Sequence, residues 1–104
     1  MAIDIDNVFE KKLSAFDAQT SQFYEWLPWV DGRLAEVPQD LAARLKWLPT
    51  YYKEPVTTDV RRALEKWYGP GRAAAIQHAE AFELCEYGAQ PDDKGLRRLF
   101  PMMK

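Results

Sequence analysis

Prolines and glycines divide this chain into short segments and limit where a helix can begin and end. Pro28 and Gly32 close the first apolar segment, and Pro49 closes the second. Proline disfavours the helical conformation in the residue before it, and glycine is a common helix terminator. We therefore expect a set of separate helices with boundaries near these residues.

The expected helices span about residues 7–26, 38–49, 58–69 and 70–88. Asp6 or Asn7 can cap the first helix, and Thr57 or Thr58 can cap the third, because short polar side chains accept hydrogen bonds from the free amides of a first turn. Pro38 suits the first turn of the second helix.

The two ends of the chain carry other signals. Ile3-Asp4-Ile5 alternates as a strand does, and a polar turn at residues 90–94, with Asp92 or Asp93 as a cap, precedes a short apolar tail. The sequence thus predicts an all-α fold of about four helices plus a short C-terminal helical tail, to which a short N-terminal strand can be added.

Composition limits the class of protein. At 104 residues and 12.1 kDa, the chain fits a single helical domain over residues 1–104. Its 14 basic and 16 acidic residues provide no broad positive surface for nucleic acid or an anionic membrane. It has no apolar run of membrane-spanning length and no signal-peptide pattern, and its one cysteine, Cys85, cannot form an internal disulfide. We therefore expect a cytoplasmic protein with no nucleic-acid or membrane partner.

A polar cluster interrupts the apolar stripe of the first expected helix. The stripe keeps a spacing of three and four residues along one face, through Ile5, Phe9, Leu13, Phe16, Phe23 and Leu27. Thr20 takes the missing step, and Gln19 and Gln22 lie beside or within the same face. Unpaired polar groups on a buried face would each cost about 1–3 kcal/mol. We therefore expect polar partners at Gln19, Thr20 and Gln22.

Two stretches resemble a known enzyme family. Phe9-Glu10-Lys11-Lys12 followed by Ala15-Phe16-Asp17-Ala18-Gln19-Thr20-Ser21-Gln22 resembles the Lys-x-x-Ala-Leu-x-x-His-x-Ser-Gln helix of the PIG-L/LmbE family of zinc-dependent de-N-acetylases. Tyr68-Gly69-Pro70-Gly71-Arg72-Ala73-Ala74, leading into Ala79-Glu80-Ala81-Phe82, resembles the Ala-Glu-Ala-Phe helix that closes many members. The match covers most of this chain but only the C-terminal part of the family.

The resemblance implies a fragment of a larger enzyme. In the family, the corresponding helices pack beside a Rossmann-like α/β sheet, and Ile3-Asp4-Ile5 would be its last strand. Within this chain alone, we expect that strand to have no partner and to expose an edge.

The family's metal-binding motifs are absent. They are an Ala-His-Pro-Asp-Asp loop and a His-x-x-His element, whereas His78 is the only histidine here. Ala89-Gln90-Pro91-Asp92-Asp93 echoes the loop, but glutamine is a poor zinc ligand and we interpret it as a turn. Gln19 stands where many relatives have a histidine, so it can hydrogen-bond but not titrate. The resemblance implies no catalytic residue and no cofactor in this chain, with zinc only in a full-length relative, and gives as substrate-pocket candidates Gln19, Ser21, Gln22, Trp26 and Glu80.

Other reactive side chains fall on the fourth expected helix. Glu80 and Glu83, one turn apart, could pair as carboxylates, but neighbouring glutamates on a helix usually form a solvated face. His78 and Cys85 would lie about 10 Å apart along the axis, too far to share a metal. We expect His78 to be a packed or surface residue and Cys85 to be a small core residue.

Aromatic residues gather near the ends of the first two expected helices, as Phe23, Tyr24, Trp26 and Trp29, and as Trp47, Tyr51 and Tyr52. Flat rings with polar edges suit sugar faces, so the turn from Trp26 to Trp29 could form part of a substrate wall. The simpler interpretation is that large rings bury much apolar area in a small chain.

Two functions remain. The first is the C-terminal helical portion of a PIG-L-type N-acetyl-sugar deacetylase, which supports or lines the substrate pocket beside a catalytic half and is inactive alone because the zinc-ligand motifs are absent. The alternative is a stand-alone helical protein-interaction module that self-associates, or binds a partner, through its aromatic turns.

Overall fold

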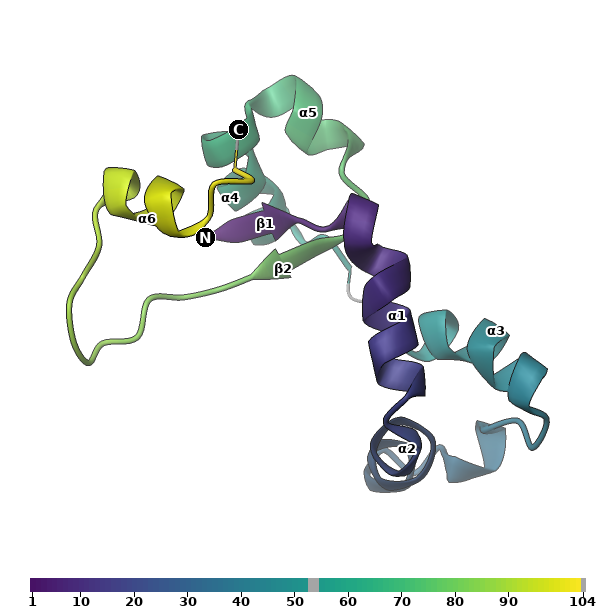
Figure 1. Cartoon of the computed structure of the whole chain (residues 1–104). Coiled ribbons are helices and arrows are strands. Elements are labelled where there is room, and N and C mark those ends of the chain that lie inside the picture. The colour runs from purple at the N-terminus through teal and green to yellow at the C-terminus, as the bar shows by residue number, and fades with distance from the viewer. Residues whose placement is uncertain (53–54, 104) are drawn as a thin grey trace. The chain divides into compact units, whose positions relative to one another are not determined.

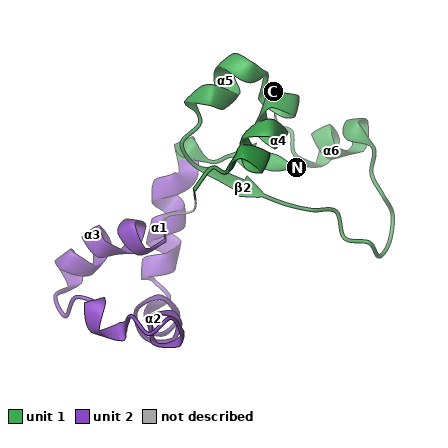
Figure 2. Cartoon of the chain, turned by 180° about the vertical axis from the view of Figure 1, so that it is seen from behind, with its two compact units in different colours: residues 1–7, 55–104 green, residues 8–54 purple. Residues whose placement is uncertain are grey.

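The computed structural model describes residues 1–52 and 55–103. They form two compact units (Figure 2), and each contains a cluster of buried side chains. Unit 1 contains Met1–Asn7 and the chain from Pro55 onward, and unit 2 is the intervening chain from Val8. In sequence, unit 2 is thus inserted after the first strand of unit 1.

Unit 1 is built on a pair of antiparallel strands. β1 (Ala2–Asp4) pairs with β2 (Ala79–Ala81), with Ile3 opposite Glu80. The helices of this unit are α4 (Thr58–Tyr68), α5 (Pro70–Ala75) and α6 (Asp93–Leu99). Figure 1 shows the two strands side by side, with α5 and β2 on opposite sides of β1. The buried core of strands and helices contains Ala2, Leu64, Ala73 and Ile76.

Local capping chemistry sets the ends of α4 and α6. The Thr57 hydroxyl accepts from the Val60 amide at 3.3 Å, and Gly69 follows α4 with a φ of 77°. The Asp92 carboxylate accepts from the Gly95 amide at 2.7 Å. The predictions of a Thr57-capped third helix ending at Gly69, and of an Asp92 cap on a helical tail, are confirmed.

Unit 2 is a chain of helical segments. A 3-10 helix (Asp6–Val8) at the junction of the two units leads into α1 (Phe9–Asp17), and a π-helical segment (Gln22–Trp26) runs directly into α2 (Leu27–Val30). A second 3-10 helix (Leu34–Glu36) then precedes α3 (Leu41–Tyr51). The core consists of Leu13, Phe23, Tyr24, Val37 and Leu48.

The chain is mostly helical with a short N-terminal strand, as predicted. The prediction of a fourth helix over residues 70–88 is wrong. The observed helix, α5, ends at Ala75, and Ala79–Ala81 is a strand. Backbone hydrogen bonds to the N-terminal residues replace helical ones here, from the Phe82 amide to the Met1 carbonyl at 2.7 Å and from the Ile5 amide to the His78 carbonyl at 3.1 Å. The expectation that the N-terminal strand lacks a partner in this chain is therefore also wrong.

Two prolines do not end helices where expected. Pro49 lies within α3, which continues to Tyr51 and begins after Asp40, whose carboxylate accepts from the Ala43 amide at 2.8 Å. Pro28 lies in the first turn of α2, directly after the π-helical segment. Proline lacks an amide hydrogen, and the wider π turn lies just where that donor is missing. Within the described ranges, no helix has both the length and the apolar character required to cross a bilayer.

Candidate functional site

A break in the first expected helix sets the geometry of the polar cluster. α1 ends at Asp17, and helical structure resumes at Thr20. The Gln19 carbonyl accepts hydrogen bonds from the amides of Gln22 and Phe23, both at 3.0 Å. Gln19 thus begins a second helical segment instead of continuing the first.

This break places most of the polar cluster in solvent. Gln19, Thr20 and Ser21 are exposed, and Gln22 is half-buried. The Gln19 amide donates from Nε2 to the Ala15 carbonyl at 3.3 Å. The prediction that Thr20 lies on the buried face is wrong, and water can meet the hydrogen-bonding needs of the exposed groups.

The π-helical segment explains the change of face. Its wider turn, in which the Leu27 amide bonds to the Gln22 carbonyl, brings the consecutive residues Phe23 and Tyr24 into the core. Phe23 then stacks on Phe16, with 4.1 Å between ring centroids. The apolar stripe is therefore restored across the break without a contribution from Thr20.

Tyr24 connects this segment to α1. Its hydroxyl donates to Asp17 at 2.7 Å, and the Arg44 guanidinium lies 5.2 Å from its ring centroid. Burial raises the pKa of the Tyr24 phenol well above its ordinary value; the hydrogen bond to Asp17 acts in the same direction, and the Arg44 charge opposes both. Tyr24 thus remains a neutral hydrogen-bond donor.

Some aromatic side chains of the two groups contact each other, and others remain on the surface. Phe23 meets Tyr52 edge to face at 4.8 Å, which joins the end of α3 to the segment after the break. Trp26 and Trp29, by contrast, are 54% and 64% exposed. The burial interpretation therefore applies to most of the rings, and these two tryptophans are left on the surface.

A second aromatic arrangement surrounds Tyr51. Trp47 stacks on its ring at 4.6 Å, the Arg33 guanidinium lies 4.9 Å from its centroid, and its hydroxyl donates to Asp31. Burial, with the hydrogen bond to Asp31 as a second cause, raises the pKa of Tyr51 to about 12. Sequence reasoning missed Asp31 and Arg33; the one available signal was their position in the turn after Trp29.

Glu80 lies in β2, in the other unit from the remaining pocket candidates. Its side chain is half-buried, whereas Glu83 lies beyond the strand and is exposed. A strand reverses side-chain direction at each residue, so the carboxylate pair expected on one helix face is not formed by this geometry. Gln19, Ser21, Gln22 and Trp26 share one continuous segment of unit 2.

His78 and Cys85 also differ from their expected helical placement. The His78 amide donates to Asp6 at 2.6 Å just before β2, and Cys85 is exposed, so its prediction as a core residue is wrong. In the described part of the chain, no three His, Cys, Asp or Glu side chains gather as a metal site requires.

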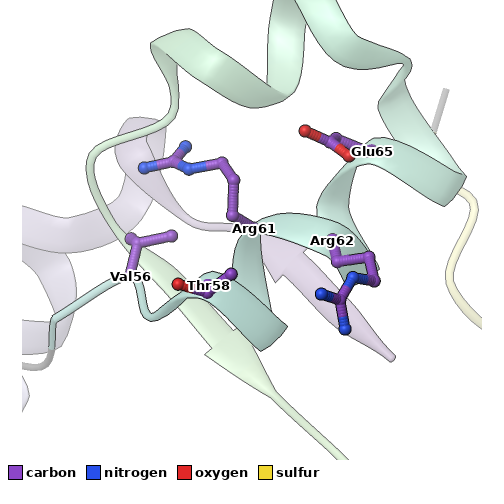
Figure 3. A pocket seen from close by; sticks show the side chains of 5 residues that line it. All are labelled: Val56, Thr58, Arg61, Arg62 and Glu65. Atoms are coloured by element: carbon purple, nitrogen blue, oxygen red, sulfur yellow. The ribbon is translucent and has the colours of Figure 1, made fainter.

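One cavity of about 310 Å³ lies along α4 (Figure 3). Its lining residues are Val56, Thr58, Arg61, Arg62 and Glu65. Arg61 donates hydrogen bonds to the carbonyls of Ala73 and Ile76. Arg62 forms an ion pair with Asp59 at 3.3 Å. The two arginine side chains leave α4 in different directions. The arginines thus hold structural partners, and none of the sequence-predicted site residues lines this cavity.

Comparisons with family models, curated proteins and solved structures gave no match to this chain. The sequence motifs and the geometry described above are therefore the indications of this protein's function.

Proposed function

We propose that this chain is the C-terminal helical portion of a PIG-L-type N-acetyl-sugar deacetylase, in which it supports or lines the substrate pocket. The basis is the pair of family-like stretches, which occur here in the family's order. Since the zinc-ligand motifs are absent from this sequence, zinc binding and water activation would belong to another part of such an enzyme.

The observation that carries the proposal is the strand at the start of the chain. The resemblance implies that Ile3-Asp4-Ile5 is the last strand of a larger sheet, and the presence of Ile3 and Asp4 in β1 (Ala2–Asp4) supports a strand in this part of the chain. Its partner, β2, contains Ala79-Glu80-Ala81 of the second family-like stretch, which is a strand here and not the helix that the resemblance implies. The beginning and end of the resembling region thus meet in one sheet, with Ile3 opposite Glu80.

The pocket candidates suit orienting roles. Gln19 and Ser21 are exposed, so their amide and hydroxyl groups are accessible to a polar substrate. Trp26 presents an exposed ring on the same segment, and rings of this kind can pack against a sugar face. None of these groups titrates near neutral pH, so they would hold the substrate and leave proton transfer to the catalytic half.

The deciding experiment is the mass of the native protein in its source cells, by immunoblot against this chain. We expect one species far above 12.1 kDa, which contains zinc and releases acetate from N-acetyl sugars when purified. The purified 104-residue chain, as the control, should neither retain stoichiometric zinc nor release acetate. A native species at 12.1 kDa, or zinc-dependent activity in the short chain, would contradict the proposal.

A stand-alone interaction module is the second candidate, favoured by the exposure of Trp26 and Trp29. The two residues are three positions apart in helical structure and so lie on neighbouring parts of one surface. Exposed tryptophans are enriched at protein interfaces. Sedimentation velocity should then show a concentration-dependent dimer that Trp29→Ser dissociates, whereas Tyr87→Ser, at an exposed aromatic residue of unit 1, should not. A monomer at every concentration would count against self-association.

A further inference from the structure

The outer edge of β2 offers unpaired backbone groups. The hydrogen bonds that face β1 include those of His78 and Phe82, whose partners are Ile5 and Met1. Bonding directions alternate along an antiparallel strand, so the amide and carbonyl groups of Ala79 and Ala81 point away from β1. Among the described residues, no further strand pairs with this edge, because the sheet consists of β1 and β2.

The chain continues from this edge with exposed apolar side chains. Figure 1 shows it running on from β2 in an extended course before it turns toward α6. Phe82, Leu84 and Tyr87 are all exposed, although the Phe82 ring keeps a stacked contact with Phe100 at 6.2 Å. An open strand edge followed by exposed apolar side chains has the features of a surface for strand addition.

The charges near β2 indicate which kind of segment can pair with its outer edge. From Ala73 to Asp93 the sequence contains acidic residues but neither lysine nor arginine. Glu83 and Glu86 are exposed next to the open edge. An antiparallel second copy paired through Ala79 and Ala81 would set the Glu80 residues of the two copies opposite each other, and like charges across paired strands are destabilising. A basic segment would instead meet opposite charges.

We propose that the outer edge of β2 binds an extended, basic segment of a partner protein by strand addition. Main-chain hydrogen bonds to Ala79 and Ala81 hold the segment, and its lysine or arginine side chains pair with Glu83 and Glu86. This interaction is separate from the deacetylase proposal and holds whether or not a catalytic half exists.

The test uses the full chain and a synthetic peptide of alternating valine and lysine, about eight residues long, which is within the usual length of a strand. Amide spectra by NMR should show the largest changes at Ala79 and Ala81, with affinity that falls as salt is added. A matched peptide of alternating valine and glutamate should not bind. Equal binding of both peptides, no binding of the basic peptide, or changes confined to other amides would overturn the proposal.

Two pairs of variants test the backbone and charge contributions separately. Ala81→Pro removes an outward amide and leaves the β1-facing amides in place, so it should weaken peptide binding about tenfold, whereas Ala81→Val should not. Glu83→Lys should weaken binding more than Glu10→Lys, an exposed site in unit 2 with the same charge change. If Ala81→Pro fails to fold, the comparison of Glu83→Lys with Glu10→Lys still tests the proposal. Equal peptide affinities of these two variants would overturn it. Concentration-dependent changes at Ala79 and Ala81 without peptide would make a second copy the occupant and would also overturn it.

Discussion

The Tyr24 hydroxyl donates a 2.7 Å hydrogen bond to the carboxylate of Asp17, across the break between α1 and the π-helical segment. Asp17 is the last residue of α1, and Tyr24 is almost completely buried. One polar contact therefore joins two helical segments whose backbone ladder is interrupted at Gln19.

Tyr24→Phe should destabilise the protein, because it removes this hydrogen bond and keeps the ring. Hydrogen bonds to charged groups contribute roughly 1.5–3 kcal/mol, so we expect a loss of about 2 kcal/mol in the free energy of unfolding. Urea denaturation followed by circular dichroism measures it. Tyr87→Phe is the control, since Tyr87 is 80% exposed. Equal unfolding free energies for the two variants would mean that the Asp17 contact contributes nothing.

The Tyr51 phenol should lose its proton at a higher pH than an ordinary tyrosine, because the fold raises its pKa to about 12. The pKa in the folded state is above the ordinary value near 10, so the stabilisation is complete below pH 10 and is lost as the pH rises toward 12. The phenolate absorbance of the native protein minus that of Tyr51→Phe should have its midpoint near pH 12. A difference curve centred near pH 10 would contradict the Asp31 contact and the burial of the ring.

Leu48→Ala should cost about 2–5 kcal/mol of unfolding free energy, since Leu48 is fully buried in the core of unit 2. Leu41→Ala provides the control on the same helix, because Leu41 is 73% exposed and its loss should change stability by less than about 0.5 kcal/mol. Thermal and urea unfolding of the two variants measure the difference. Similar losses at both positions would mean that α3 does not bury the face described here.

Arg61→Ala should destabilise unit 1 by about 2 kcal/mol, because the guanidinium group serves carbonyls of Ala73 and Ile76 at the end of α5. The neighbouring Arg62→Ala removes only an exposed pair with Asp59 and should cost less than about 0.5 kcal/mol. Amide hydrogen exchange in α5 locates the effect, with faster exchange expected only for Arg61→Ala. Unchanged exchange in α5 would contradict the structural role of Arg61.

Features that depend on neighbouring residues could be predicted from the sequence. Thr57, Gly69 and Asp92 act through backbone groups a few positions away, and their roles as helix boundaries were predictable. The strand at Ala79–Ala81 was not predictable, because its alanine-rich surroundings favour a helix by local propensity. Pairing with β1, which lies far away in sequence, overrides that preference.

The candidate site shows the same division between local and distant causes. The sequence pattern predicted Gln19, Ser21 and Gln22 as site residues, but the exposure of Gln19 and Ser21 depends on a break that no proline or glycine marks. The π-helical turn then changes which residues face the core, and a regular 3.6-residue periodicity cannot represent this change. Asp31 and Arg33 belong to the Tyr51 arrangement only because the chain turns back toward α3.

The insertion of unit 2 after β1 gives the two strands very different times of synthesis. Ile3 leaves the ribosome before unit 2, but Glu80, which lies opposite it in the sheet, follows only after unit 2 and helices α4 and α5 have been made. At translation rates of roughly 5–20 residues per second, β1 waits for about 4–15 s before its partner strand emerges. Unit 2 can complete its own core during this interval, so a nascent chain would expose Ala2 and Ile3, which are buried in the finished protein, until β2 emerges.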